Sequence, residues 1–259
     1  MLLLGLDTAT PTVSVAVGDG ARVLARRDLG PAPGGAGGRR SASPRHGELL
    51  APAVRDALAE AGVPGAELTH VVCGVGPGPF TGVRVGVVTA RVLGLALGVP
   101  VVGICTLDAL AARAGQPCLA VIDARRREVY AAAYDAHGRR TWGPRVLRPA
   151  DLADAVGEAP RLAVGPGAHL YRDLLAASGL LIAAPADVDA AALVALAAAR
   201  LSAGEPVPEV AAYTVSDADG DGRATLVPEG LLAPEPLYLR RPDAVPSVAV
   251  AAPAAEGAW

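Results

Sequence analysis

Lysine and asparagine are absent from this chain of 259 residues, and all 23 of its basic side chains are arginines. Without lysine the chain has no Schiff-base nucleophile and no Walker-type phosphate loop, which ends in Lys-Ser or Lys-Thr. The abundant alanine, glycine, proline and arginine follow GC-rich codons. A surface arginine is therefore a weaker sign of phosphate recognition here than it would be in a chain of balanced composition.

A surplus of positive charge is also missing, since the formal net charge is -3. This argues against a dedicated DNA-binding protein, because non-specific affinity for phosphates comes from a basic surplus. The three cysteines, Cys73, Cys105 and Cys118, lie far apart in apolar runs. That placement is typical of reduced core thiols and not of a disulfide framework or a zinc site.

Neither a signal peptide nor a membrane span is expected. Asp7 ends the apolar run at residues 1–6 too soon for a signal peptide, and no basic residue precedes that run. Arg84, Arg91 and Pro100 interrupt the longest apolar stretch, residues 83–105. We therefore expect a cytoplasmic protein that does not contact the membrane.

The chain reads as two similar halves, each opening with three short strands. In the first half, strands are expected at 2–7, 12–18, 21–28, 70–75 and 99–104, with helices at 44–61 and 81–97. In the second, strands are expected at 118–123, 128–135, 140–147 and 161–165, with helices at 149–156, 168–177 and 187–203. The loop at 30–43 is expected to be mobile.

A duplicated β-meander with helices, in which an acidic residue ends the first strand of each copy, is the signature of an α/β, two-lobed actin-like (ASKHA) fold. We expect an N-terminal lobe at 1–105 and a C-terminal lobe at 106–205. The closing helix at 187–203 is predicted to pack back on the first lobe. Residues 206–259 are rich in Pro, Gly and Asp, and are expected to be partly disordered, with one strand-like island at 237–240.

The two acidic strand ends are candidate nucleotide sites. In the actin-like fold such turns wrap phosphates with backbone N–H groups while the Asp holds a metal-bound water. Asp7 and Thr8 form the first turn and Asp123 the second. An ordinary hairpin turn, with Asp and Thr bonded to their own backbone, explains the first equally well. Arg125, Arg126 and Arg127 after Asp123 either meet RNA or a partner or form a solvated loop, and composition favours the loop slightly.

Motif-type catalytic sites are missing. A histidine pair on one helix face needs i, i+4 spacing, and position 50, four residues after His46, is Leu50. No Gly-x-Ser-x-Gly elbow occurs. The acidic run at 217–222 begins like a calcium loop, but its last ligand position falls on Pro228, which favours a flexible acidic loop.

Small residues recur every four positions along the helix expected at 81–97. They are Gly82, Gly86, Ala90, Gly94 and Gly98. Glycine within a helix costs roughly 1 kcal/mol relative to alanine, so the stripe needs the close approach of another backbone. Internal packing explains part of it, and a partner's helix completing a bundle is the functional interpretation. On that view Gly86→Leu would weaken the complex and spare the isolated fold.

Several segments together resemble the TsaB (YeaZ) family. They are residues 4–10, His46 with residues 48–50, residues 76–86, 106–107, 122–125, 128–130 and 236–240. The Gly-Pro-rich run from Gly76 to Gly82 is the most specific. Pro79 departs from the family, which usually has Ser at that position. The resemblance extends from Met1 to about Arg241.

The resemblance implies a role without its own chemistry. In the family, TsaB binds and supports TsaD, which carries the histidine-held metal and transfers a threonylcarbamoyl group to the adenosine beside the anticodon of tRNAs reading ANN codons. The ATPase TsaE joins the assembly, TsaB also forms a homodimer, and tRNA is met through the complex. No cofactor of this chain's own is implied, although ATP or ADP could bind at the complex interface.

The implied partner-binding elements are the helices at 44–61 and 81–97. The expected interface residues are Leu50, Val54, Gly82, Gly86, Ala90 and Gly94. The alternative function is an actin-fold nucleotide-dependent enzyme, a kinase or a metallopeptidase-like protein. That alternative predicts phosphoryl transfer or metal-dependent hydrolysis by the isolated chain, lost on Asp7→Ala.

Overall fold

Short β-rich runs separated by turns fold into a meander at the N-terminus. In the computed structural model, which describes residues 1–30, 46–157, 160–208 and 227–239, the strands β1 (Leu3–Asp7), β2 (Val13–Gly18) and β3 (Val23–Leu29) pair antiparallel in sequence order. Strands β4 (His70–Gly74) and β5 (Val101–Ile104) continue the sheet on the other side of β1, in parallel. The order is β3-β2-β1-β4-β5, so β1 is central and wholly buried.

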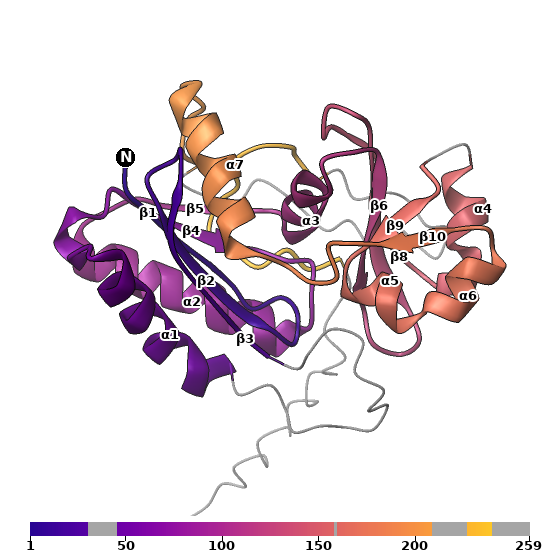
Figure 1. Ribbon diagram of the computed structural model, residues 1–259, viewed down its shortest axis with the longest axis horizontal. Coiled ribbons are helices and arrows are strands. Elements are labelled where there is room, and N and C mark those ends of the chain that lie inside the picture. The colour runs from indigo at the N-terminus through magenta and orange to yellow at the C-terminus, as the bar shows by residue number, and fades with distance from the viewer. Residues whose placement is uncertain (31–45, 158–159, 209–226, 240–259) are drawn as a thin grey trace, which may run out of the picture.

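Three helices cover the two faces of this sheet (Figure 1). On one face, α1 (His46–Ala61) contacts β2 and β3, and α2 (Phe80–Leu97) contacts β4 and also α1. On the other face lies α7 (Ala190–Ser202), which contacts β1 and β2 although it follows the second lobe in the chain. Helices on both faces explain why β1 and β2 are wholly buried and mostly apolar.

The second sheet repeats the order of the first. Its strands are β6 (Cys118–Asp123), β7 (Val129–Tyr134), β8 (Arg140–Leu147), β9 (Leu162–Val164) and β10 (Leu181–Ala183). They lie in the order β10-β9-β6-β7-β8, with an antiparallel β6-β7-β8 meander and parallel β9 and β10. The first strand of the lobe is again central, so Asp7 and Asp123 end equivalent strands.

Side-chain alternation along β6 assigns its two faces to different helices. Leu119 and Val121 belong to a core with residues of α4 (Leu152–Val156), α5 (Pro166–Leu170) and α6 (Arg172–Ala177). Ala120 and Ile122 point the other way, into a core shared with α3 (Thr106–Ala114) and the N-terminal lobe. Because α3 also packs on α7, these two helices join the lobes (Figure 1).

The structure differs from the expectations in several details. Helix α3 and strand β10 were not predicted. The helix expected at 168–177 is divided at Tyr171, and the short helix η1 (Gly65–Glu67) was also missed. The helix expected at 149–156 begins with the short helix η2 (Pro149–Asp151). Of the island expected at 237–240, residues 237–239 are described and are not assigned to a strand, whereas Leu232 forms a bridge with Gly103.

Several expectations fall wholly or partly on residues outside the described ranges. These are the loop at 30–43, of which only Gly30 is described, the acidic run at 217–222 and the tail beyond residue 239. Helix α1 is described from His46 onward. By length and composition alone α2 could cross a membrane, a test that helices packed in protein cores also pass.

Candidate functional site

The first acidic turn is closed by the chain itself. The side chain of Asp7 is buried, and its Oδ1 accepts a hydrogen bond from the backbone N–H of Ala9 at 2.7 Å. Its Oδ2 accepts from the hydroxyl of Thr106, at the start of α3, at 2.8 Å. Burial raises the pKa of this carboxyl to about 6, against the lowering effect of the two hydrogen bonds. Both oxygens are thus used within the protein.

Helix α2 begins directly against this turn. The hydroxyl of Thr8 donates to the carbonyl of Gly82 at 2.7 Å. A Cβ atom on Gly82 would lie 2.5 Å from the carbonyl oxygen of Thr8, and one on Gly86 would lie 2.5 Å from the Thr8 hydroxyl. The ring Nε2 of His46 lies 2.9 Å from the carbonyl of Thr10. These contacts hold the turn, α1 and α2 together as one unit.

The residues predicted at the partner interface lie inside the N-terminal lobe and not on its surface. All six of them are buried within the N-terminal lobe: Leu50, Val54, Gly82, Gly86, Ala90 and Gly94. The glycine face of α2 approaches the β1 turn, and a Cβ on Gly94 would meet Val101 of β5. Gly86→Leu would for this reason disrupt the isolated fold, contrary to the earlier expectation. The stripe from Gly82 to Gly94 serves packing within one lobe, whereas Gly98 is the exposed left-handed residue that ends α2.

The opposite face of α2 is exposed and carries large apolar side chains, with the exposed Arg84 and Arg91 between them. Val88, Val92 and Leu95 are 56%, 59% and 86% exposed, and they follow i, i+4, i+7 spacing. At the start of the helix, Phe80 stacks on Tyr238 with 5.0 Å between ring centroids, and Arg84 lies over the Phe80 ring. An open groove of about 540 Å³ runs between Phe80 and Thr89. We call Phe80, Val88, Val92 and Leu95 the α2 outer face.

The chain near Tyr238 reaches α2 through backbone bonds to the first lobe. Leu232 exchanges two hydrogen bonds with Gly103 of β5, and the N–H of Leu237 donates to the carbonyl of Val75 at 2.8 Å. These bonds place Tyr238 beside Phe80. The α2 outer face was not predicted, although the spacing of Val88, Val92 and Leu95 in the sequence was a signal for it.

The second acidic turn is open. Asp123 is only partly buried, and its Oδ1 accepts from the N–H of Arg125 at 3.0 Å and from the hydroxyl of Tyr171 at 3.3 Å. Arg125, Arg126 and Arg127 are all exposed. Thus Asp7 and Thr8 lie together in a sealed turn, while Asp123 lies on the other lobe in an accessible one. Nucleotide binding at either turn stays a prediction.

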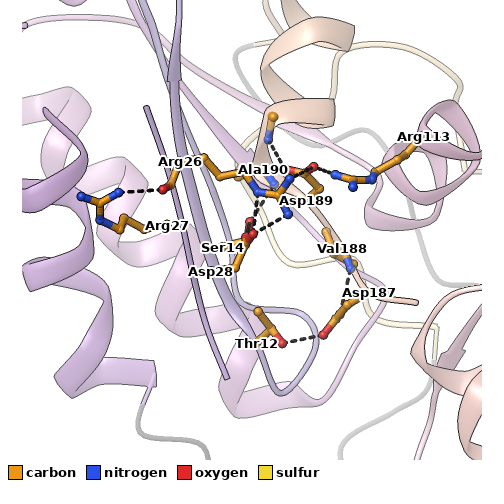
Figure 2. Close-up of polar contacts among 11 residues, drawn as sticks. Thr12, Ser14, Arg26, Arg27, Asp28, Arg113, Asp187, Val188, Asp189 and Ala190 are labelled. Atoms are coloured by element: carbon orange, nitrogen blue, oxygen red, sulfur yellow. Dashed lines mark hydrogen bonds and ion pairs between the residues drawn. The ribbon is translucent and has the colours of Figure 1, made fainter. Parts of the chain in front are cut away.

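A third polar cluster ties the lobes where α7 begins (Figure 2). The buried Asp189 caps α7 by accepting from the N–H of Ala191. Its other oxygen forms ion pairs with Arg26 of β3, at 2.8 Å, and with Arg113 of α3. Removing Asp189 would leave both guanidinium groups without this shared partner. The contact links the N-terminal sheet to the helix that packs on the C-terminal sheet.

Groups suited to nucleophilic or metal chemistry are scattered among the described residues. No three His, Cys, Asp or Glu side chains in the described ranges converge on one point. The three cysteines are buried, and burial raises the pKa of the Cys73 and Cys105 thiols to about 12. Such thiols carry almost no reactive thiolate near neutral pH.

Two five-stranded mixed sheets of identical order, joined through paired helices, define a protein of the two-lobed actin-like class. The comparisons narrow this class to a family. Residues 24–211 match the sequence profile described as "TsaD: tRNA N6-adenosine threonylcarbamoyltransferase". The tRNA threonylcarbamoyladenosine biosynthesis protein TsaB of Escherichia coli is 32% identical over 70% of this chain and 78% of its own length. The chain belongs to the TsaB (YeaZ) family.

Two further relatives extend the similarity over most of the molecule. An uncharacterised protein of Mycobacterium tuberculosis is 41% identical and covers 94% of both chains. The solved structure of YeaZ from Pseudomonas aeruginosa superposes with a TM-score of 0.64 at 31% identity, over 80% of this chain and 96% of its own. The predicted fold class and family are confirmed.

Proposed function

We propose that this chain is a non-catalytic subunit that binds TsaD and supports threonylcarbamoyl transfer to the adenosine beside the anticodon of tRNAs reading ANN codons. Membership of the TsaB family makes tRNA threonylcarbamoyladenosine biosynthesis the process concerned. The finer role rests on this chain's own surface. The complex acts in the cytoplasm, and TsaE joins it there. ATP or ADP binds at the interface of the complex and not at a site formed by this chain alone.

The observation that carries the proposal is the α2 outer face. A helix of 18 residues keeps three large aliphatic side chains exposed on one side while its glycine face is fixed to the sheet. Exposed apolar residues in register on a rigid helix are typical of a surface that a partner covers. Without TsaD, the same face would pair with a second copy of this chain.

The polar and ionisable side chains near α2 support a role without catalysis. Asp7 uses both oxygens in internal hydrogen bonds, and Thr8 and His46 bond to backbone carbonyls. A general base or a metal-holding carboxylate needs an accessible oxygen. These side chains instead fix the position and direction of α2.

Two measurements test the proposal. The first is co-purification with the organism's own TsaD, and the second is a tRNA modification assay with and without this chain. We expect Val92→Arg to weaken TsaD binding at least tenfold, because it removes a valine that the partner would cover and places an unpaired charge in the interface. Val23→Arg is the matched control, since Val23 is a half-exposed valine on β3 of the same lobe.

Two outcomes would contradict the proposal. One is equal TsaD affinity for Val92→Arg and Val23→Arg, with modification unaffected by omitting the chain. The other is phosphoryl transfer or hydrolysis by the purified chain alone that Asp7→Ala abolishes, which would favour the actin-fold enzyme.

A further inference from the structure

The hairpin turn between β6 and β7 holds its arginines in an unusual backbone conformation. Arg125, Arg126 and Arg127 have φ angles of 61°, 53° and 61°, the left-handed region. For residues other than glycine this conformation costs roughly 1–2 kcal/mol each. The chain has 31 glycines, and glycine would adopt the same turn without that cost. GC-rich codons explain an arginine, but they do not explain three arginines where glycine fits better.

The base of the turn is anchored by Asp123, and the three arginines beyond it are exposed. Asp123 fixes the N–H of Arg125 and pairs with its guanidinium at 3.6 Å, on the exposed surface. Tyr171, between α5 and α6, bonds to the same carboxylate oxygen. The next residue, Arg172, is exposed, with its guanidinium 2.9 Å from Nδ1 of His169. We call Arg125, Arg126, Arg127, Tyr171 and Arg172 the basic hairpin cluster.

The shape of this cluster selects among anionic ligands. A site for one small anion has donors that converge in a concavity. Here three consecutive exposed arginines lie in the turn of a hairpin, which suits a polyanion with repeated phosphates. Arginine binds phosphate through two parallel N–H donors, and a partly exposed tyrosine ring offers a surface on which a base can stack.

We propose that the basic hairpin cluster binds the phosphate backbone of RNA, so that this chain contacts the tRNA directly through its C-terminal lobe. The choice of RNA over other polyanions rests on the proposed function, whose substrate is tRNA. Contacts of this kind position the RNA and carry no sequence information. The cluster therefore discriminates little between tRNAs, and its contribution to affinity falls steeply with salt.

Binding of an in vitro transcribed ANN-reading tRNA to the full chain, measured by fluorescence anisotropy between 50 and 200 mM salt, tests this inference. The test variant is Arg125→Asn/Arg126→Asn/Arg127→Asn, because asparagine tolerates the left-handed region. The control is Arg22→Asn/Arg55→Asn/Arg139→Asn, which removes three other exposed arginines and changes the net charge equally. We expect the test variant to lose at least tenfold in affinity and about two units of salt slope, while the control changes less than threefold.

Three results would overturn the inference: no tRNA binding by the wild type at 50 mM salt, equal losses in the two variants, or hairpin-dependent binding to phosphatidylserine vesicles without binding to tRNA. Exposed Leu170 and Leu174 beside the cluster make the vesicle measurement necessary. TsaD co-purification of the same variants separates this inference from the proposed function. If the hairpin substitutions leave tRNA binding unaffected while TsaD still binds through α2, only the inference about RNA fails and the proposed function stands.

Discussion

Equivalent turns in the two lobes have opposite surroundings. Each follows the central strand of a five-stranded sheet and begins with an aspartate. In the N-terminal lobe the turn is buried under α1 and α2, and its polar atoms bond to the protein. In the C-terminal lobe the turn is exposed and carries three arginines. The same position in the fold thus fixes a helix in one lobe and presents side chains to solvent in the other.

This difference suggests how the lobes divide their tasks. Because Thr8 and the glycines of α2 interlock, the α2 outer face is held in a fixed direction. A rigid face loses less conformational entropy when a partner binds to it. The C-terminal turn lacks such a cover. We infer that the first lobe serves the protein partner and the second the RNA.

The largest effect is expected where the buried turn meets α2. In Gly86→Ala the added Cβ would lie 2.5 Å from the Thr8 hydroxyl, so Thr8 must move and its bond to Gly82 is lost. We expect a loss of about 3 kcal/mol in the free energy of unfolding, measured by urea denaturation. Gly47→Ala, in α1 with nothing within 4 Å, should gain about 0.5–1 kcal/mol. Equal midpoints would show that the turn is not tightly packed.

The buried carboxyl of Asp7 should make stability depend on pH. Burial raises its pKa from 3.8 to about 6 in the folded state, so the folded protein binds this proton more tightly than the unfolded chain. The contribution of Asp7 is therefore fully favourable below about pH 4 and is lost as the pH rises to about 6, by roughly 2–3 kcal/mol. Urea midpoints across this range, for wild type and Asp7→Asn, measure it. A slope that persists in Asp7→Asn belongs to other groups.

A substitution in the exposed β6–β7 turn should give the smallest change in the free energy of unfolding, and this change should be stabilising. Arg127→Gly relieves a φ of 61° and should raise the unfolding free energy by about 1 kcal/mol. Arg139→Gly, in the β7–β8 hairpin, is the control, because Arg139 is exposed but has no positive φ, and it should be neutral or slightly destabilising. Thermal denaturation of both variants decides between strain at the turn and a general effect of glycine.

The lobes and most strands were predictable, because alternating and continuous apolar runs specify strands locally. The residues of the proposed partner surface on α2 were not predicted. The four-residue spacing of Gly82, Gly86, Ala90 and Gly94 correctly placed them on one face of a helix. Periodicity cannot tell which face of a helix packs against a sheet. Small residues mark a place where another backbone comes close, and here that backbone belongs to the same chain. Tyr171 was unpredictable for another reason: it reaches Asp123 across 48 positions of sequence.

Calorimetric titration of TsaD into three forms of the chain tests the division between the lobes most directly. These are the wild type, Val92→Arg on the α2 outer face, and the triple arginine-to-asparagine variant of the β6–β7 hairpin. The account predicts that Val92→Arg raises the dissociation constant at least tenfold and that the hairpin variant leaves it within twofold of the wild type. The reverse pattern, with TsaD binding lost in the hairpin variant and retained in Val92→Arg, would contradict it.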